Sequence, residues 1–509
     1  MDRRKLLKSG AALGALAGVM NTAPFLSSTA IARDEFSSLD GMGQAKLIQS
    51  GQVSPLELVD AAIKRIEKMN PVLNAVVHES FEYARKAAAG QIPDGPFTGV
   101  PYLIKDLSDV AGLPTSFGSK LFENNIANVD NGSVMRAKNA GLLILGKTNT
   151  PEFGFTSTTE PNLMGAARNP WNTAYQTGGS SGGAAAAVAS GMVPFAHASD
   201  GGGSIRIPAS VCGLVGLKPS RNRLFVMEPI KSSADISVRL AVSRSVRDTA
   251  QILNVSEFKR EEVNVVHDPV GFVSSASTRR LKIAFSTRDY LGKEPHPDVR
   301  TAVEKTAKLC ADLGHIVEPV EAPAVGEEFM EHFMNNWASM AANMVDQAWL
   351  IGLTQARIIS AEKVFEPWTL GLAEFYQRRF EKDDQIIPKA LAYFDKVAEQ
   401  YDAFFKSYDV QLTPVLSRPP FLIGEQSINQ DFETHLETVL DYVRYTPQHN
   451  AAGIPAITLP LYTSRKGLPI GSQFGAKYGD EQTLLELAYE LEQAAPWGNR
   501  WPEISDVNL

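Results

Sequence analysis

The sequence predicts an α/β protein built on a mixed β-sheet that is covered by helices. Short apolar runs bounded by glycine or proline recur along the chain, and their length is typical of buried strands. Stretches with apolar residues at helical spacing lie between these runs. Alternation of this kind is typical of a sheet whose strands are separated by the helices that pack on it. No linker-like stretch divides the chain, so we expect a single domain over residues 33–509.

The composition excludes several classes of protein. With 509 residues, 44% of them hydrophobic and 21% charged, the chain has ample material for a large core. A net charge of −8 and the lack of any long basic run disfavour a nucleic-acid partner. Two cysteines, Cys212 and Cys310, cannot build a disulfide framework or a cysteine-rich zinc site, and no HExxH occurs. Nothing in the sequence therefore indicates a metal.

The first 32 residues resemble a twin-arginine export signal. Arg3 and Arg4 precede an apolar run over residues 11–20 that is too short to span a bilayer, and Ala-Ile-Ala at 30–32 fits a cleavage site. We expect a periplasmic or secreted protein with no stable membrane insertion after the signal is removed; a cytoplasmic protein with a basic start is the alternative. The segment carries a charge of +3, so the rest of the chain carries −11.

The first folded elements are expected to be helices. In "SPLELVDAAIKRIEKMN", Ser54 can cap a helix, Pro55 suits its first turn and Glu57 completes a capping box. Asn70-Pro71 is predicted to end this helix. A second helix over "SFEYARKAAAG" is predicted to end at Gly90.

The predicted strands and later helices follow. Helices are expected over residues 297–313 and 480–494. The strand-like runs are "GVPYLIK", "GLLILGKT", "MVPFAHA", "LKIAFS", "DVQLTP", "IPAITLPLY" and "LPIGSQFG".

Residues 320–450 are expected to form a helical excursion rich in aromatic residues. Within it, one set of large apolar side chains recurs at helical spacing: Met330, Phe333, Met334, Trp337 and Met344. This set fits the wall of an apolar pocket, where methionine adapts to ligand shape. It also fits plain core packing, which is the more common meaning of such a pattern.

The stretch "GLLILGKT", residues 141–148, matches the pattern of a nucleotide-binding phosphate loop. A phosphate loop follows a strand and opens a helix, whereas here the four middle leucine and isoleucine residues are themselves strand-like. Pro151 follows closely and no long helix can begin there. We therefore predict a strand rather than a nucleotide site.

Lys105 ends the run "GVPYLIK". Burial at a strand end lowers the pKa of a lysine, and the neutral amine can then act as a general base. A salt bridge with Asp106 or Asp109 is the alternative, and it is the more common one for a lysine considered alone.

Two glycine-rich stretches are candidates for an active-site floor. "TGGSSGGAAAAVASG", residues 177–191, runs directly into a helix former, unlike a flexible linker. In "DGGGSIRIP", residues 200–208, three glycines allow successive N–H groups to converge into an oxyanion hole, and Ser204 is placed as a nucleophile. Plain packing for the first stretch and a tight turn for the second are the alternatives.

Taken in order, the lysine after "GVP", then "GGSSGG", then "DGGGSIRIP" resemble the amidase signature family. "LILGKTNTPEFGF", "NPWN", "GLVGLKPSR" and "PAITLP" are also similar to that family. The resemblance covers roughly residues 39–498; it is tight over a signature core at 99–221 and loose over about 320–440. It implies the amidase signature fold, a central mixed twisted β-sheet with helices on both faces.

The resemblance also implies a Ser-cisSer-Lys triad. Carried over by motif position, Ser204 is the nucleophile, Ser180 is the bridging residue with a cis backbone, and Lys105 is the base. The remaining implied site residues are the oxyanion-hole N–H groups of Gly201, Gly202, Gly203 and Ser204, and the supporting residues Ser181 and Arg206. Gly201 departs from the family, in which many members carry a larger residue.

The implied reaction is acyl transfer from a small-molecule amide to serine, loss of the amine and hydrolysis by water, with no metal and no cofactor. Within the family, cyclic-amide and aryl- or alkyl-amide hydrolases look most similar, and a homodimer is compatible with the sequence. One alternative is the catalytic subunit of a glutamine-dependent amidotransferase; the export signal and the acidity of the chain count against it. The other is a non-catalytic binding protein on the same fold; the intact Lys105, Ser180 and Ser204 count against it.

Overall fold

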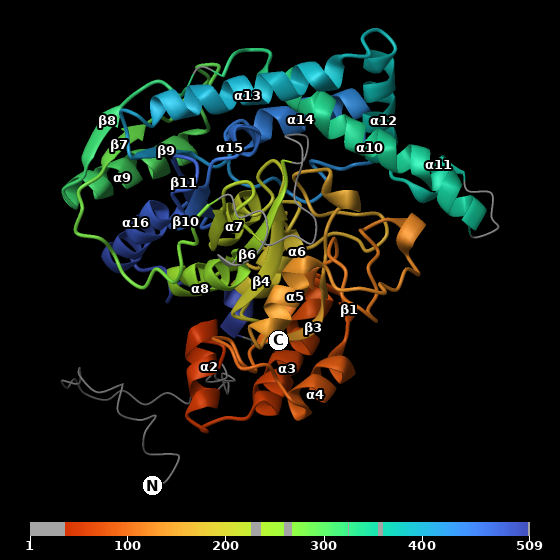
Figure 1. The fold of residues 1–509 in the computed structure, drawn as a ribbon, viewed down its shortest axis with the longest axis vertical. Coiled ribbons are helices and arrows are strands. Elements are labelled where there is room, and N and C mark those ends of the chain that lie inside the picture. Colours follow the sequence, from red (N-terminus) through yellow and green to blue (C-terminus); the bar gives the residue numbers. More distant parts are fainter. Residues whose placement is uncertain (1–35, 225–235, 259–266, 324, 355–359, 507–509) are drawn as a thin grey trace, which may run out of the picture.

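The structure is a computed structural model that describes residues 36–224, 236–258, 267–323, 325–354 and 360–506. The export signal predicted at residues 1–32 lies outside the described residues. Within these ranges the strands form two sheets, which lie side by side through the middle of the molecule (Figure 1). The strands are β1 Val76–Glu79, β2 Pro101–Lys105, β3 Leu143–Thr148, β4 Phe195–Asp200, β5 Val215–Lys218, β6 Val238–Ser243, β7 Lys282–Phe285, β8 Ile316–Pro319, β9 Val410–Pro414, β10 Ala456–Thr463 and β11 Pro469–Ala476.

Both sheets mix parallel and antiparallel pairs, as predicted. The smaller sheet has the order β1-β3-β2, and the larger has the order β4-β6-β5-β10-β11-β9-β7-β8. The pairs β2–β3, β7–β8 and β7–β9 are parallel, and the other pairs are antiparallel. The sequence predicted one sheet, whereas the hydrogen-bonded ladders of the described residues form two. The two sheets adjoin where β2 lies beside β4. Lys105 is the last residue of β2.

Helices cover the large sheet on both faces, which confirms the predicted fold class. Successive residues of a strand point to opposite faces. On β11, the Ser472 hydroxyl lies 2.7 Å from the Thr306 hydroxyl of α9, whereas a Cβ on the neighbouring Gly471 would stand 2.9 Å from Ser210 Oγ of α7. Helices α7 and α9 therefore pack on opposite faces of the same strand.

The helices account for most of the remaining chain. In order they are α2 Gly41–Gln49, α3 Pro55–Leu73, α4 Phe81–Ala89, α5 Gly132–Asn139, α6 Gly182–Ala189, α7 Arg206–Cys212, α8 Val246–Ser256, α9 Pro297–Asp312, α10 Phe329–Thr354, α11 Ala361–Val364, α12 Pro367–Phe380, α13 Ile386–Phe404, α14 Phe432–Tyr442, α15 Pro447–Ala452 and α16 Glu481–Ala494. Among the helices of the described ranges, none combines the length and the apolar character needed to cross a bilayer.

Helix α3 begins as predicted but ends later. The capping box forms, since the Glu57 N–H donates to Ser54 Oγ and the Ser54 N–H donates to the Glu57 carboxylate. The prediction that Asn70-Pro71 ends the helix was wrong, because the helix continues to Leu73. Proline in the last turn removes only one intrahelical bond, and burial of Leu73 together with a left-handed cap at Asn74 holds the final turn in place.

The stretch 141–148 contains a strand, β3 at Leu143–Thr148, as predicted, and not a phosphate loop. Strand β3 is buried along its whole length, and Lys147 Nζ lies 3.0 Å from Asp106 Oδ1. Only a short 3₁₀ turn at Glu152–Gly154 follows. Lys147 is therefore an interior partner of a carboxylate.

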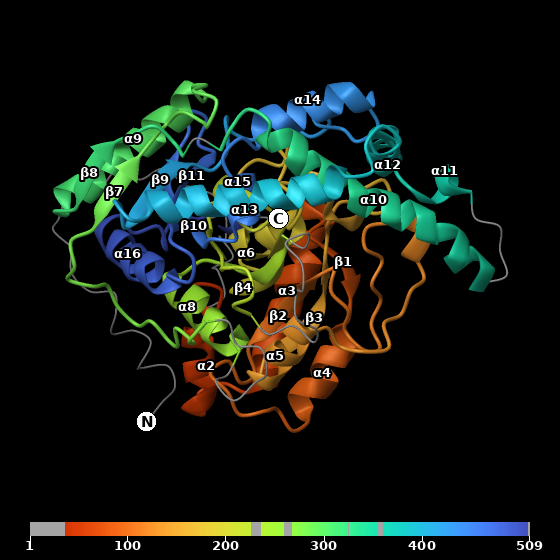
Figure 2. The same ribbon diagram turned by 45° about the horizontal axis from the view of Figure 1, so that its top comes forward.

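The excursion over residues 320–450 forms a helical layer above the large sheet. Helices α10, α12, α13 and α14 lie together at the top of the molecule (Figures 1 and 2). They enclose a second apolar core, separate from the main core around the sheets, that includes Phe329, Phe333, Trp368 and Phe394. Strand β9 is the exception within this range, because it pairs with β7 and β11 in the large sheet.

Candidate active site

Lys105 lies at the buried end of β2 and faces three serine hydroxyls. Its side chain has no solvent exposure. Its Nζ lies 2.7 Å from Ser180 Oγ, 2.9 Å from Ser181 Oγ and 3.0 Å from Ser199 Oγ. Two of these hydroxyls belong to the stretch 177–191 that the sequence singled out. Ser199, on β4, is a contact that sequence reasoning missed.

The salt bridge considered for Lys105 does not form. Asp106 instead contacts Lys147, and it accepts the Ser116 hydroxyl at 2.5 Å. Asp109 Oδ1 is buried without a hydrogen-bond partner among the described residues. Lys105 is thus a buried amine among hydroxyls, and burial holds the pKa of its ammonium well below the ordinary lysine value. The charge of Arg239 lowers this pKa further, and that of Asp200 opposes the shift.

Ser180 is held in place by tightly packed glycines. The Gly179–Ser180 peptide bond is cis, as the family resemblance implied. A Cβ on Gly179 would stand 2.5 Å from the Thr158 carbonyl oxygen, and one on Gly183 would stand 2.3 Å from the Asn149 nitrogen. Only glycine lets the backbone approach this closely, so the stretch is a compact floor rather than a linker. The Ser181 hydroxyl also donates to the Ser199 carbonyl oxygen at 3.2 Å.

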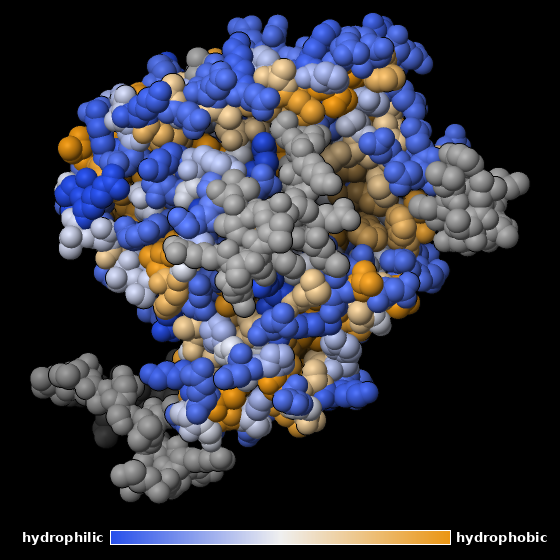
Figure 3. Space-filling model, in the orientation of Figure 1, coloured by the Kyte–Doolittle hydropathy of each residue, from blue (hydrophilic) through white to orange (hydrophobic). Residues whose placement is uncertain are grey.

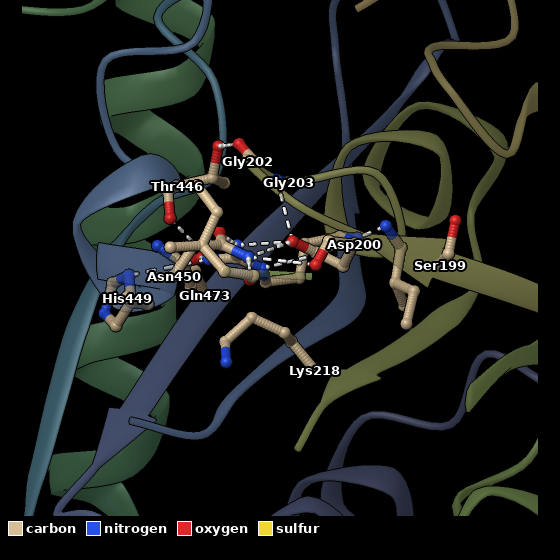
Figure 4. Close-up of polar contacts among 12 residues, drawn as sticks. Ser199, Asp200, Gly202, Gly203, Lys218, Thr446, His449, Asn450 and Gln473 are labelled. Atoms are coloured by element: carbon tan, nitrogen blue, oxygen red, sulfur yellow. Dashed lines mark hydrogen bonds and ion pairs between the residues drawn. The ribbon is translucent and has the colours of Figure 1, made fainter. Parts of the chain in front are cut away.

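Ser204 lies in the loop between β4 and α7, with 8% of the residue exposed. Gly203, just before it, has φ +133°, and a Cβ there would stand 2.4 Å from Thr446 Oγ1. The Thr446 hydroxyl donates to the Gly202 carbonyl at 2.6 Å (Figure 4). The loop that presents Ser204 is therefore shaped by a contact with the C-terminal half of the chain.

The N–H groups of the glycine loop are not equivalent. The Gly203 N–H donates to Asp200 Oδ1 at 2.8 Å, so the loop already uses it internally (Figure 4). Among the described residues, no hydrogen bond from the N–H of Gly201, Gly202 or Ser204 is found. Of the four N–H groups expected in the oxyanion hole, these three are the ones left for a ligand.

Arg206 braces the loop through Asp200, as expected from its position. Its Nε and Nη2 donate to Asp200 at 2.9 Å each, and it also binds Asn450 and Gln473. Burial alone would raise the pKa of the Asp200 carboxyl, but the Arg206 guanidinium holds it well below its usual range. The pair is wholly buried, and its remaining polar atoms are satisfied by Thr446 and Asn450 (Figure 4). Asp200 was missed from the sequence, although its place directly before three glycines was a signal.

An apolar pocket of about 490 Å³ opens above Ser204, and Gly154, Gly179 and Gly202 also line it. The Ser180 hydroxyl faces the same floor, since a Cβ on Gly154 would stand 3.0 Å from its Oγ. The large side chains of the wall are Phe155, Met330, Phe333, Met334, Trp337, Trp368, Leu440 and Val443. Among the described lining residues none is charged. Figure 3 shows an apolar hollow on the face between α10 and the loops below it.

The apolar side chains on α10 serve both as pocket wall and as core packing. Met330, Phe333, Met334 and Trp337 line the pocket, whereas Met344 only packs against the apolar core of the helical layer. The wall touches the glycine loop directly: a Cβ on Gly201 would stand 2.9 Å from the Trp337 ring. The glycine at this position makes room for that ring.

A family model described as Amidase matches residues 57–485 of the chain. The chain is a member of the amidase signature family. The protein named "Putative amidase AmiC" from Mycobacterium tuberculosis (strain ATCC 25618 / H37Rv) is 41% identical over 467 residues, which cover 91% of this chain and 96% of that protein. Membership makes the chain a hydrolase of carbon–nitrogen bonds other than peptide bonds.

Solved structures of the amidase signature family have the same fold. A structure of 6-aminohexanoate cyclic dimer hydrolase complexed with substrate has a TM-score of 0.85 and 32% identity, covering 92% of this chain and all of that one. A bacterial aryl acylamidase of the family has a TM-score of 0.79 and 26% identity, covering 92% and 99%. One component of the glutamyl-tRNA(Gln) amidotransferase of Synechococcus sp. (strain CC9605) is 33% identical over 88% of this chain and 94% of its own length. The amidotransferase considered as an alternative is therefore a more distant relative of this chain than the amidases.

The amidase signature site in this chain holds no cluster suited to a metal ion. Across the ranges that the structure describes, no three His, Cys, Asp or Glu side chains come together as ligands would. Cys212 and Cys310 are both free and buried.

Proposed function

We propose that this amidase hydrolyses small amides with an uncharged, apolar acyl group through an acyl-enzyme on Ser204. The observation that carries the proposal is the pocket above Ser204, whose described wall is mostly apolar and carries no charged residue. Burying an apolar acyl group there is favourable, whereas a charged group would lose its hydration without gaining a partner. Aryl acyl groups and the methylene chains of cyclic amides both have the required chemistry.

The contacts of Lys105 support its role as the base that receives the proton of Ser204. A neutral amine has two N–H donors and one lone pair, which matches three hydroxyl neighbours if one of them donates to the nitrogen. Ser180 is placed to be that donor, because its hydroxyl also faces the pocket floor at Gly154. As Ser204 Oγ attacks the carbonyl carbon, its proton passes to Ser180 while the Ser180 proton passes to Lys105.

The remaining steps use the same groups in reverse. The N–H groups of Gly201, Gly202 and Ser204 stabilise the oxyanion of the tetrahedral intermediate. Lys105 then returns its proton through Ser180 to the nitrogen of the leaving amine as the carbon–nitrogen bond breaks. Water repeats the sequence on the acyl-enzyme, releasing the acid and restoring Ser204.

We expect kcat/KM for anilides of benzoic or hexanoic acid to exceed kcat/KM for succinyl or 6-aminohexanoyl anilides by about 100-fold or more. Each factor of ten in this ratio corresponds to a difference of only about 1.4 kcal/mol in transition-state binding. Met330→Ala, which shortens the pocket wall, should reduce this preference. Met340→Ala on the same helix packs only in the apolar core and is the matched control. Equal or faster cleavage of the charged acyl anilides would refute the proposal.

We also propose that residues 1–32 direct export by the twin-arginine route, on the basis of Arg3 and Arg4 and the Ala-Ile-Ala at 30–32. Replacing both arginines with lysine should retain the precursor in the cytoplasm. Mass spectrometry of the exported protein should find an N-terminus near Arg33. A full-length N-terminus on periplasmic protein would show that the segment is not a cleaved signal.

A further inference from the structure

A second cavity is lined by residues of β2, β4 and β6 and shares no described lining residue with the pocket above Ser204. It holds about 660 Å³ of empty space, which includes the solvent at its mouth. Its walls combine apolar side chains such as Leu240 and Ile252 with polar ones such as Ser133, His197 and Arg239. No Asp or Glu occurs among its described lining residues.

Arg239 gives this cavity a positive charge that no described carboxylate pairs with. The residue is half-buried on β6, and no ion pair or side-chain hydrogen bond of its guanidinium is found within the described residues. Arginine presents a planar set of donors that matches a carboxylate, which it binds in preference to neutral groups. An unpaired guanidinium at the wall of a cavity therefore favours a carboxylate ligand.

His197 lies buried beside Arg239 at the wall of the cavity. The residue is 2% exposed, its Nε2 lies 3.1 Å from Ser133 Oγ, and its Nδ1 is buried without a hydrogen-bond partner in the structure. The Ser133 hydroxyl donates to Asn131 Oδ1 at 3.0 Å, so its oxygen accepts from the His197 Nε2–H. That tautomer leaves Nδ1 an acceptor, so Arg239 is the group that binds an anion here.

We propose that this cavity binds a small organic carboxylate. The carboxylate lies against Arg239, and the apolar body of the ligand packs on apolar lining such as Ile252. This site is separate from the pocket above Ser204, and its occupancy does not depend on the function proposed above.

The geometry couples such a ligand to the catalytic lysine. Arg239 pairs with Ser199 across the β4–β6 ladder, and Ser199 Oγ lies 3.0 Å from Lys105 Nζ. Of the charged groups around Lys105, Asp200 raises the lysine pKa and Arg239 lowers it. The pKa of His197 is itself lowered to about 3 by burial and by Arg239, so this residue is neutral. A carboxylate on Arg239 offsets the guanidinium charge, so the pKa of Lys105 rises. The ligand is then an inhibitor whose effect is greatest on the acid side and disappears at high pH.

Calorimetric titration of the full chain with sodium benzoate tests the binding directly, with sodium chloride as the ionic control. Arg239→Gln should weaken benzoate binding at the cavity about tenfold or more, whereas Trp337→Ala, which removes a wall residue of the pocket above Ser204, should leave it unchanged. If the single binding event is instead lost in Trp337→Ala and kept in Arg239→Gln, benzoate binds only as a product in the active site and the proposal is wrong.

A second pair of variants covers the case in which Arg239→Gln fails to fold. Arg239→Lys keeps the charge and should bind benzoate detectably, and Ala137→Met, which fills the cavity wall, should abolish binding with the charge intact. In amidase assays benzoate should shift the acid limb of kcat/KM to higher pH, and this shift should be absent in Ala137→Met. Benzoate binding that is unaffected by Ala137→Met would overturn the assignment of the cavity.

Discussion

Replacing Ser204 with alanine is expected to lower kcat/KM for amide hydrolysis by about 10⁴-fold or more. The loss follows from removal of the only atom that can form the acyl-enzyme in the proposed reaction. The fold should be unchanged, because within the described residues no hydrogen bond to Ser204 Oγ is lost. Circular dichroism and the thermal midpoint should therefore match those of the wild type, and labelling by a fluorophosphonate probe should disappear.

Ser180 and Ser181 provide the matched comparison. Both hydroxyls lie within 3 Å of Lys105 Nζ, at 2.7 Å and 2.9 Å. Only Ser180 is assigned a proton-transfer step, so Ser180→Ala should lose much more activity than Ser181→Ala. If Ser181→Ala lost more activity than Ser180→Ala, the proton would pass through Ser181 and the assignment of Ser180 would be wrong. Activity of Ser204→Ala within tenfold of the wild type would remove the nucleophile assignment altogether.

The sequence predicted the parts of this site that depend on local chain geometry. Lys105 could be placed at a strand end because "PYLI" is a short apolar run, and the glycines around Ser180 and Ser204 marked places where the backbone packs closely. These signals are contained within about ten residues each. They required only strand length and the absence of a Cβ.

The parts that the sequence did not predict depend on contacts between distant segments. Thr446, Asn450 and Gln473 complete the Asp200–Arg206 network from more than 200 residues away, and no periodicity indicates such a pairing. The pairing of Asp106 with Lys147 rather than with Lys105 likewise depends on the register of β2 beside β3. The continuation of α3 beyond Pro71 shows tertiary burial overriding a local signal.

The choice between pocket wall and core packing for the α10 residues could not be made from spacing alone, because both use the same helical face. The structure places Trp337 and Phe333 against Gly201 and Gly202, with a Cβ at either glycine standing 2.9–3.0 Å from a ring atom. The helical layer is therefore fitted to the loop that carries the nucleophile. The sequence feature that could have indicated this fit is the small residue at position 201 itself.

Lys105→Ala is expected to lower kcat/KM by roughly 10² to 10⁴-fold near neutral pH, the usual contribution of a general base. Wild-type Lys105 must be neutral to accept a proton, and burial holds its pKa well below the ordinary value near 10.5. Below that lowered pKa the lysine becomes protonated, so the wild-type rate should fall tenfold per pH unit on the acid side. Above it the rate should stay level until the fold fails.

The pH profiles of the variants distinguish a base from a residue that only packs. In Lys105→Ala part of the lost activity should return at high pH, where hydroxide can replace the amine. Lys105→Arg keeps a permanent positive charge and should remain inactive on both sides of the profile. A histidine base would instead give an acid limb near pH 6.5, but burial lowers the pKa of the nearby His197 to about 3. A Lys105→Ala enzyme with the wild-type rate and the wild-type acid limb would show that another group accepts the proton of Ser204.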